Sequence, residues 1–381
     1  MSTYQSPWMT EELAIFRAAA SRFVETEMVP KDPQWRQQHH LDKAFWRLAG
    51  QQGFLCTDIP ECYGGGGGDF RHEAVFFEEQ WRRGLSGMGQ GVHSITAHYI
   101  LNHGTEAQKQ RWLPAMARGE LIGAIAMTEP GTGSDLKAIR TRAVRDGDHY
   151  VVNGAKIFIT NGYLGELLAL VVRTDPEAGA RGLSILMLET RDLPGFRVGR
   201  ILDKMGQKSQ DTCELFFDDV RVPVANLLGG REGQGFAQLM ADLPYERTQV
   251  GVQSVAMMEG AIAETVAYVK QREAFGAPLF ELQNTRFRLA EAQTLTRVSR
   301  VFLDHCIAEV AAGHLDNATA AMCKYWTSER LQQVLDTCLQ MHGGYGYMDE
   351  YLICRMYADA RVARIYAGTS EIMLEVVARS L

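Results

Sequence analysis

The hydrophobic period of this sequence changes twice along the chain, and this change restricts the possible folds more than any other feature. From about residue 10 to 120, apolar residues such as Leu13, Phe16, Ala20 and Phe23 recur at steps of three and four, which is the helical period. From about 121 to 230 the sequence has short β runs, and after Gly235 long helical stripes return. We therefore predict an α+β protein with three domains: residues 1–120 helical, 121–230 β, and 231–381 a bundle of four or more helices.

The middle region is typical of an antiparallel barrel or sandwich. The dipeptide Asn153-Gly154 lies between the β runs His149–Val152 and Ala155–Thr160, and it is the strongest short signal for a two-residue hairpin. No helical pattern intervenes between the β runs that follow, which argues against a parallel sheet. These further runs are Leu167–Arg173, Gly182–Leu188, Phe196–Ile201 and Cys213–Phe217.

Composition and charge exclude several classes of protein. Of the 381 residues, 46% are hydrophobic and 22% are charged, as in folded globular proteins. The net charge of −7 argues against a nucleic-acid binder, which needs a basic face. The clearest apolar run, Leu167 to Val172, is far too short for a membrane span. The N-terminus shows no secretory signal, so we expect a cytoplasmic protein, or a mitochondrial matrix protein if a transit peptide has been removed.

The cysteines and histidines do not indicate a metal site. Seven cysteines are present, an odd number, and none forms a Cys-x-x-Cys pair, so we interpret them as reduced and buried thiols. His93, His98 and His103 recur every five residues, which spreads them around a helix instead of aligning them. We therefore predict no metal centre.

Three clusters remain as candidates for chemistry, because the usual phosphate and nucleophile motifs are missing. Met127-Thr-Glu-Pro-Gly-Thr-Gly-Ser-Asp135 follows a β run with small and hydroxyl residues, which let backbone N–H groups approach a phosphate or a ring edge. Taken alone, this cluster is equally compatible with a plain tight turn. Gln340-Met-His-Gly-Gly-Tyr-Gly346 interrupts a helix, and Ile365-Tyr-Ala-Gly-Thr-Ser-Glu371 places two hydroxyls and a carboxylate at a helix start.

In this order, the three clusters resemble the signatures of the acyl-CoA dehydrogenase family. The first differs from the usual element only at Thr132, where alanine is common, and the stretch from Gln340 to Asp359 matches the second signature throughout. Lys156–Asn161 and Arg272–Gly276 are similar to two further family segments. The resemblance covers nearly the whole chain. It implies an N-terminal helical domain, a middle antiparallel β-barrel domain and a C-terminal four-helix bundle.

The resemblance implies a bound FAD between the β-domain and the C-terminal helices. Phe158 would lie against the isoalloxazine, Thr160 near its N5, and Arg272 at the pyrophosphate, partly from a neighbouring subunit of a homotetramer. The full set of implied cofactor residues is Met127, Thr128, Gly133, Ser134, Phe158, Ile159, Thr160, Arg272, Phe275, Gln283, Gln340, Gly343, Gly344, Thr369 and Glu371.

The resemblance also points to the catalytic base, through a departure from the common pattern. Most members carry a glutamate where this chain has Ala367, in Tyr366-Ala367-Gly368-Thr369. Leu243-Pro-Tyr-Glu-Arg247 resembles the segment from which the isovaleryl and long-chain branches supply their glutamate, so Glu246 is the implied base. The alternative is a solvated acid near a helix start, because Pro244 disfavours helix at the residue before it.

Whether the pKa of Glu246 is lowered by a helix N-terminus or raised by an apolar pocket is left open by the sequence. The implied substrate residues are Ser134 and Tyr245, Arg247 at the CoA moiety, and Ala367 with Gly368, whose backbone would bind the thioester carbonyl.

The leading hypothesis is FAD-dependent α,β-dehydrogenation of an acyl-CoA thioester to the trans-2-enoyl-CoA, with electrons passed to electron-transferring flavoprotein. A flavin oxidase or monooxygenase on the same fold is the first alternative. A non-catalytic acyl-CoA-binding protein is the second. The chain length and branching of the acyl group are not specified by the sequence.

Overall fold

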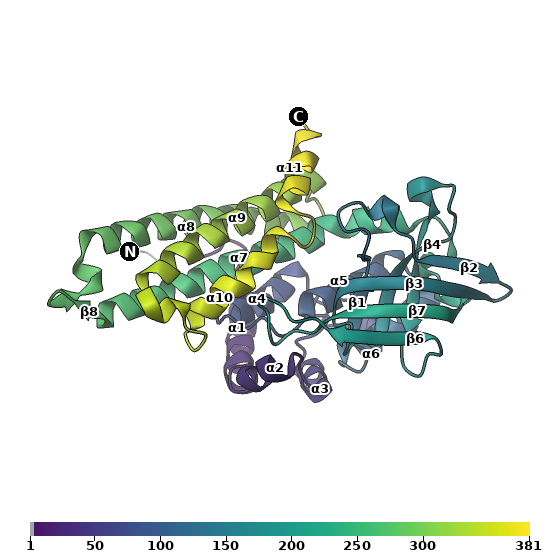
Figure 1. Cartoon of the computed structure of the whole chain (residues 1–381), viewed down its shortest axis with the longest axis horizontal. Coiled ribbons are helices and arrows are strands. Elements are labelled where there is room, and N and C mark those ends of the chain that lie inside the picture. The colour runs from purple at the N-terminus through teal and green to yellow at the C-terminus, as the bar shows by residue number, and fades with distance from the viewer. Residues whose placement is uncertain (1–3) are drawn as a thin grey trace.

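The computed structural model describes residues 4–381, and its three parts follow the order of the hydrophobic periods. The long helices occupy one end, the sheet occupies the other, and the N-terminal helices pack against both (Figure 1). The predicted helix at Leu13 is α1 (Glu11–Phe23), which begins at the N-cap Thr10 and continues as a π-helical segment to Met28. The other N-terminal helices are α2 (Asp32–Gln38), α3 (Lys43–Gln51), α4 (Phe70–Trp81), α5 (Gln90–His103) and α6 (Glu106–Ala117).

The middle of the chain forms a seven-stranded sheet in the order β1-β4-β2-β3-β7-β6, with β5 also paired to β4. Most pairs are antiparallel, as predicted, but β1 and β2 both run parallel to β4. Alternating apolar positions of these strands form a core of their own. The strands are β1 (Gly123–Ala126), β2 (Arg142–Asp146), β3 (His149–Thr160), β4 (Leu167–Arg173), β5 (Leu183–Glu189), β6 (Phe196–Ile201) and β7 (Thr212–Pro223).

The predicted hairpin at Asn153-Gly154 is wrong, because both flanking runs belong to the single strand β3. Gly154 instead lies at an irregularity in the pairing of β3 with β7, with a φ of 153°. A Cβ at Gly154 would collide with Thr141, so the glycine allows two strands to approach closely. The tight turn lies earlier, at Gly147-Asp148, where β2 reverses into β3.

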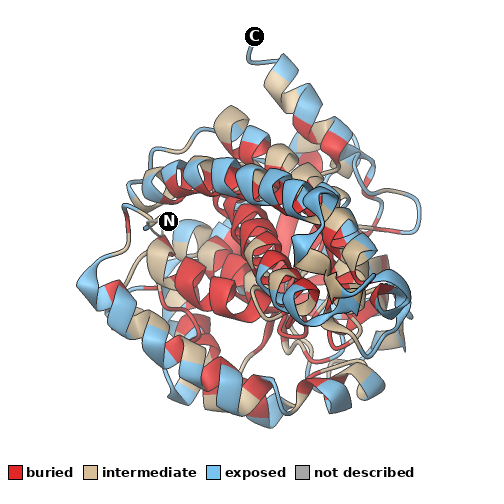
Figure 2. Ribbon diagram, turned by 90° about the vertical axis from the view of Figure 1, so that its left-hand side faces the viewer, coloured by how far each residue is buried: buried red, intermediate tan, exposed pale blue. Residues whose placement is uncertain are grey.

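The C-terminal helices form a bundle around α7 (Gly235–Gln271), which is buried along much of its length (Figure 2). Pro244 lies inside this helix, so the predicted helix start near it is wrong. Proline lacks one backbone N–H, and the surrounding packing holds the helix together through that gap. The other bundle helices are α8 (Gln283–Ala311), α9 (Asn317–Met341), α10 (Leu352–Ala360) and the short α11 (Ser370–Ala378), which packs on α9.

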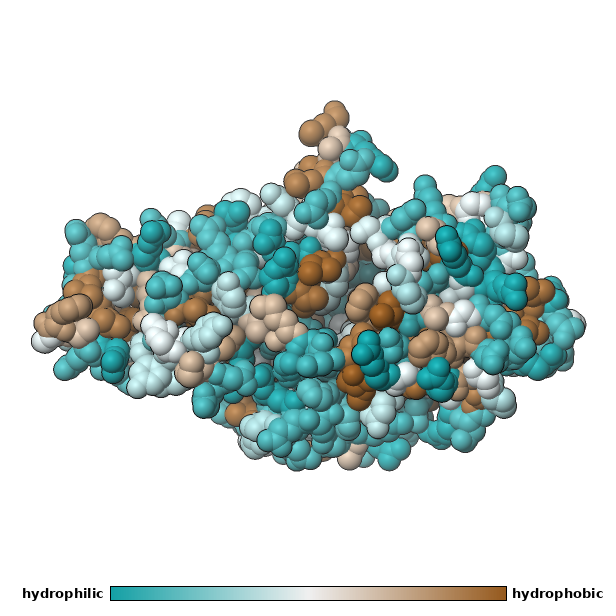
Figure 3. Space-filling model, viewed as in Figure 1, coloured by the Kyte–Doolittle hydropathy of each residue, from teal (hydrophilic) through white to brown (hydrophobic). Residues whose placement is uncertain are grey.

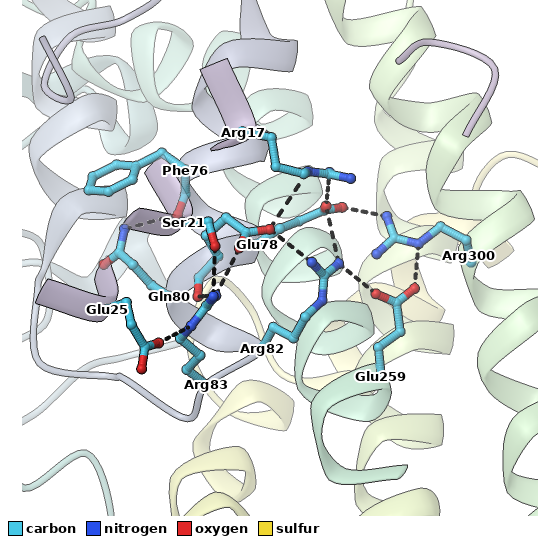
Figure 4. Close-up of polar contacts among 11 residues, drawn as sticks. Arg17, Ser21, Glu25, Phe76, Glu78, Gln80, Arg82, Arg83, Glu259 and Arg300 are labelled. Atoms are coloured by element: carbon cyan, nitrogen blue, oxygen red, sulfur yellow. Dashed lines mark hydrogen bonds and ion pairs between the residues drawn. The ribbon is translucent and has the colours of Figure 1, made fainter. Parts of the chain in front are cut away.

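A network of ion pairs fastens the N-terminal helices to the bundle (Figure 4). Arg300 on α8 contacts Glu78 on α4 and Glu259 on α7. Arg82 joins the same Glu259, and Arg17 of α1 reaches Glu78. Arg300 and Glu78 are both buried, so removing either one would leave an uncompensated charge in the interior.

The cysteines follow the predicted chemistry, with two exceptions in burial. All seven are free thiols, and five of them are buried. Cys62 is exposed and Cys354 is partly exposed, so the prediction of burial is wrong for these two. No helix in the described part of the chain is long and apolar enough to cross a membrane.

Candidate functional site

The end of β3 presents an aromatic ring to the outside of the sheet. Phe158 is 63% exposed and has a φ of 61°, within an irregular stretch of the pairing with β7. A positive φ is costly for a bulky residue, so the surrounding structure must enforce it. The next residue, Ile159, is buried in the core of the sheet, so its side chain faces away from Phe158, while Thr160 is half-buried. The ring of Phe158 is therefore available to stack on a planar ligand.

The loop after β1 is anchored by a buried ion pair. Lys156 on β3 donates to the carbonyl of Met127 at 2.8 Å and to Glu129 at 2.9 Å. Glu129 also accepts the backbone N–H groups of Arg140 and Thr141. Burial lowers the pKa of Lys156 to about 8; burial alone would raise the pKa of Glu129, but Lys156 and the hydrogen bonds lower it. Both groups thus stay charged near neutral pH and fix the loop.

The outer side of this loop is open. A Cβ added at Gly131 or Gly133 would meet nothing within 4 Å, and Ser134 is exposed. Thr132, the residue that departs from the usual family element, donates its hydroxyl to the carbonyl of Asp135 and so closes the turn. The loop therefore has a fixed base and a free outer face, where a ligand can contact its backbone.

The turn between α10 and α11 has an unusual backbone held from two sides. Ala367 has a φ of 52° and Gly368 one of 88°. Lys324 on α9 donates to the carbonyl of Gly368 at 2.6 Å, and the Tyr366 hydroxyl donates to Gln253 on α7. Within residues 4–381, the N–H of Ala367 donates to no protein acceptor. This donor is therefore free for a ligand.

Thr369 and Glu371 begin α11 beside this turn. Thr369 is the N-cap and accepts the N–H of Ile372, as its predicted place at a helix start requires. Glu371 lies exposed in the first turn. Both residues therefore follow Ala367, whose N–H is free, within four positions of the chain.

Glu246 lies inside α7 and is only 7% exposed. Its Oε1 accepts the hydroxyl of Tyr99 on α5 at 2.6 Å. Burial raises the pKa of Glu246 to about 7, Asp242 raises it as well, and the Tyr99 hydrogen bond and Arg247 oppose the rise. The interpretation as a solvated acid at a helix start is wrong. Of the two effects that the sequence left open, the raised pKa is the one the structure has.

Arg247 and Tyr245 flank the carboxylate and point into different surroundings. Arg247 is buried and donates to the carbonyl of Asn317, while its Nε has no partner. Burial lowers the pKa of Arg247, although Glu246 beside it acts in the opposite direction. The hydroxyl of Tyr245 donates to Asp58 at 2.8 Å, which directs it into the N-terminal domain. A buried guanidinium with an unused donor is suited to an anionic ligand.

The remaining predicted cofactor residues lie at the far end of α7. Phe275 is 97% exposed, at the tip of the turn between β8 (Glu273–Ala274) and β9 (Ala277–Pro278). Arg272 lies 5.8 Å from the ring centre of Tyr345, and both border a cavity of about 410 Å³. Gly343 and Gly344 line the same cavity, and Gln283 and Gln340 are exposed nearby on α8 and α9.

The predicted cofactor residues around Arg272 lie far from Glu246 and Phe158 within one chain. Arg272 follows Glu246 by 26 residues of one helix, a distance of about 39 Å at 1.5 Å per residue. In Figure 1 the β8 turn is at one end of the molecule and β3 is at the other. A single ligand of ordinary size cannot contact both groups of the same chain.

The residues that support the site from behind carry little signal in the sequence. Tyr99, Gln253 and Lys324 belong to none of the family-like segments, and Lys156 begins the segment Lys156–Asn161 without a role that the sequence assigns to it. Lys324 had one usable signal, because it is a charged residue inside a helix whose neighbours are apolar. Tyr99 had none, since a tyrosine on a buried helix face resembles ordinary core.

Comparisons with known proteins place the chain among flavin-dependent dehydrogenases. "Acyl-CoA dehydrogenase, N-terminal domain" matches residues 10–120, "Acyl-CoA dehydrogenase, middle domain" matches 124–220, and "Acyl-CoA dehydrogenase, C-terminal domain" matches 233–381. The mitochondrial long-chain specific acyl-CoA dehydrogenase of Mus musculus is 44% identical over 375 residues, which are 98% of this chain and 87% of that protein.

Two solved structures are similar over nearly their whole length. An acyl-CoA dehydrogenase from Geobacillus kaustophilus is 46% identical, with 99% of each chain covered and a TM-score of 0.96. A structure described as "Electron transferring flavoprotein of Acidaminococcus fermentans: Towards a mechanism of flavin-based electron bifurcation" is 35% identical, with 99% of each chain covered and a TM-score of 0.94.

Proposed function

Because this chain belongs to the acyl-CoA dehydrogenase family, as its sequence predicted, we propose that Glu246 is the base that removes the α-proton of an acyl-CoA thioester. The protein is an FAD-dependent oxidoreductase of acyl-CoA. The observation that carries the proposal is the buried carboxylate of Glu246, whose pKa is raised to about 7, in a chain that has no acid at Ala367. A base poised near the working pH is efficient in proton transfer.

The residues of the β-domain fit FAD. Phe158 offers an exposed ring face on a constrained backbone, and the loop at Gly131 and Gly133 has a free outer face. When bound, FAD accepts the hydride that leaves the β-carbon of the substrate. The residues that would hold the flavin end are Met127, Thr128, Gly133, Ser134, Phe158, Thr160 and the backbone of Ile159, together with Thr369 and Glu371.

The remaining steps belong to residues of this chain. Glu246 takes the α-proton onto its carboxylate as the α,β double bond forms. The free N–H of Ala367 donates to the thioester carbonyl and stabilises the negative charge that develops there, which is worth about 3–4 kcal/mol in comparable oxyanion sites. Arg247 offers its unused Nε to the CoA moiety, and Ser134, Tyr245 and Gly368 complete the proposed substrate set. The product is the trans-2-enoyl-CoA.

The family resemblance implies a homotetramer, which we propose for this chain. An assembly of copies is supported by the cofactor residues that lie too far from Phe158 to serve the same FAD: Arg272, Phe275, Gln283, Gln340, Gly343 and Gly344. A second copy would bring them to it. Exposed apolar side chains support such an interface: on α8, Phe287, Val298 and Val301 are each at least half exposed. Hydrophobic side chains also gather at the β8 end in Figure 3.

The proposed electron acceptor is electron-transferring flavoprotein, in accord with the family and with the similarity to the Acidaminococcus fermentans structure. Relatives occur in mitochondria and in bacteria, so a mitochondrial matrix or bacterial cytoplasmic location is proposed for this chain. The oxidase alternative differs only in using oxygen directly. The non-catalytic alternative is disfavoured by the buried Glu246, because an acid of raised pKa costs stability that a binding protein has no need to lose.

One experiment tests these alternatives together. A panel of acyl-CoA thioesters of different length and branching is mixed with the yellow protein without oxygen, and flavin bleaching is followed. We expect bleaching by at least one thioester, and turnover only with electron-transferring flavoprotein or a dye. Comparable turnover with oxygen alone would favour the oxidase, and no bleaching by any thioester would contradict dehydrogenation.

A further inference from the structure

The catalytic carboxylate is held by a neighbouring helix that carries none of the family signatures. Tyr99 on α5 donates its hydroxyl to Oε1 of Glu246 at 2.6 Å. Tyr99 is completely buried, so water does not compete for this hydrogen bond. In the described part of the chain, the other oxygen of Glu246 accepts no protein hydrogen bond. One oxygen is thus held and the other is free.

The position of Tyr99 is itself fixed by contacts between α5 and α7. Asp242, one turn before Glu246, accepts from Asn102 at 2.7 Å and from His103 at 2.9 Å, and both donors are on α5. These three hydrogen bonds join the last turn of α5 to α7 on either side of Pro244. They hold α7 against α5 at the point where the proline leaves the helix without one backbone N–H.

From this geometry we infer that Tyr99 is a positioning residue for the reaction, which orients the Glu246 carboxylate and favours its ionised form. The inference rests on the proposed role of Glu246. A hydrogen bond donated to the charged form of an acid favours that form. Burial raises the pKa of Tyr99 well above its ordinary value, so the phenol stays protonated and remains a donor throughout the range of activity.

The other charged groups around Glu246 define what the test must separate from Tyr99. Asp242 on the same helix disfavours the ionised form of Glu246, and Arg247 favours it. His103 on α5 faces Asp242, and Lys324 on α9 lies near Arg247. In the adjoining N-terminal domain, Asp58 binds His98 and accepts the hydroxyl of Tyr245. None of these groups is changed by replacing the hydroxyl of Tyr99 with hydrogen.

The experiment measures how the rate of flavin reduction depends on pH in Tyr99→Phe. The substrate is the saturated acyl-CoA that bleaches the wild-type protein fastest, at saturating concentration and without oxygen. Loss of a hydrogen bond to a charged group should move the acidic limb of the profile up by about one pH unit. At pH 7 the reduction should then be about five-fold slower, because less Glu246 is ionised, while the affinity for acyl-CoA changes little.

A matched control is Tyr150→Phe. Tyr150 is also buried and also donates to a carboxylate, Glu232, but it lies in the β-domain away from Glu246. Its profile should coincide with that of the wild-type protein. An acidic limb that does not move in Tyr99→Phe would overturn the inference, whether or not the rate falls. So would an equal shift in Tyr150→Phe.

A second measurement needs no turnover. The free energy of unfolding of Tyr99→Phe is compared with that of Tyr99→Phe/Glu246→Gln across pH, which reports the ionisation of Glu246 in the folded protein. The difference between the two should keep changing up to a pH about one unit higher than in the pair without the Tyr99 change, because only the folded-state pKa of Glu246 moves. An unchanged upper limit would overturn the inference. If Glu246→Gln alone reduces flavin at the wild-type rate, the proposed base fails, whereas an inactive Glu246→Gln with an unshifted Tyr99→Phe refutes only the role of Tyr99.

Discussion

The candidate site residues at the two ends of α7 differ in burial. Near its beginning, Glu246 and Arg247 are buried, and side chains of α5 and α9 surround them within one chain. At its end, Arg272 is exposed and Phe275 is almost fully in solvent. The site residues near the beginning of α7 are enclosed by their own chain, whereas those at its end are exposed and lack a partner surface within the described residues.

This difference follows from what each end has to do. A base needs a low-polarity surrounding to raise its pKa, and only packed protein provides one. A residue that completes a neighbour's cofactor site has to be on the surface of its own chain. An exposed phenylalanine with a φ of 56° is costly for a lone chain and reasonable for an interface. Substitutions at the two ends should therefore affect different properties.

The largest expected effect is at the beginning of α7. Glu246→Gln keeps the shape of the side chain but cannot accept the α-proton, so flavin reduction by acyl-CoA should slow by about 10²–10⁴-fold. The bound FAD and the affinity for acyl-CoA should change little. Anaerobic stopped-flow measurement of flavin bleaching checks this, and near-wild-type bleaching would refute the assignment of the base.

The matching control supplies a replacement carboxylate at position 367. Ala367→Glu in the Glu246→Gln protein should restore part of the activity, since most of the family carries its glutamate there. Ala367 already has a Cβ at a φ of 52°, so the longer side chain adds no new backbone strain. The double variant remaining as slow as Glu246→Gln would mean that this position cannot reach the substrate here.

The next largest effect is expected at Lys156, which anchors the loop after β1. Lys156→Met removes one partner of the buried pair with Glu129 and frees the carbonyl of Met127, so the protein should lose about 3–5 kcal/mol of stability and also retain FAD less well. Lys43→Met is the control, because Lys43 pairs with Glu166 at the surface and such pairs contribute about 1 kcal/mol or less. Denaturant titration and FAD release measure both. Equal losses in the two variants would contradict an anchoring role.

The raised pKa of Glu246 predicts how stability depends on pH. A carboxyl whose pKa is higher in the folded protein stabilises the fold below pH 4.5 and loses that contribution as pH rises through about 7. Glu246→Gln has no such loss, so its free energy of unfolding should exceed that of the wild-type protein by up to about 3 kcal/mol above pH 7. The excess should be much smaller at pH 5. Unfolding of both proteins at several pH values, with FAD saturating, measures the gap. A gap that stays constant with pH would contradict a titrating Glu246.

The sequence predicted the order of the domains and the family because both depend on local pattern. It failed where neighbours distant in sequence decide. Asn153-Gly154 has the chemistry of a hairpin, yet the pairing of β3 with both β2 and β7 extends the strand through it. Pro244 has the chemistry of a helix boundary, yet packing carries α7 across it. Tyr99 reaches Glu246 only through the contact of α5 with α7, which no local pattern encodes.

The smallest expected effect is at the far end of α7, and it tests the idea of a shared site. Arg272→Ala removes a guanidinium suited to a phosphate of a neighbour's FAD, and loss of such a charge-assisted hydrogen bond should weaken FAD binding by about ten- to a hundred-fold. Within residues 4–381 Arg272 makes no ion pair, and its guanidinium lies 5.8 Å from the ring centre of Tyr345, so stability without FAD should change little. Arg118→Ala is the control and should leave FAD binding intact, because Arg118 is exposed at the end of α6, away from the proposed interface, and pairs with Glu120. FAD release on dilution measures both. Equal release from the two variants would show that Arg272 does not contact the cofactor, and the two ends of α7 would then no longer belong to one shared site.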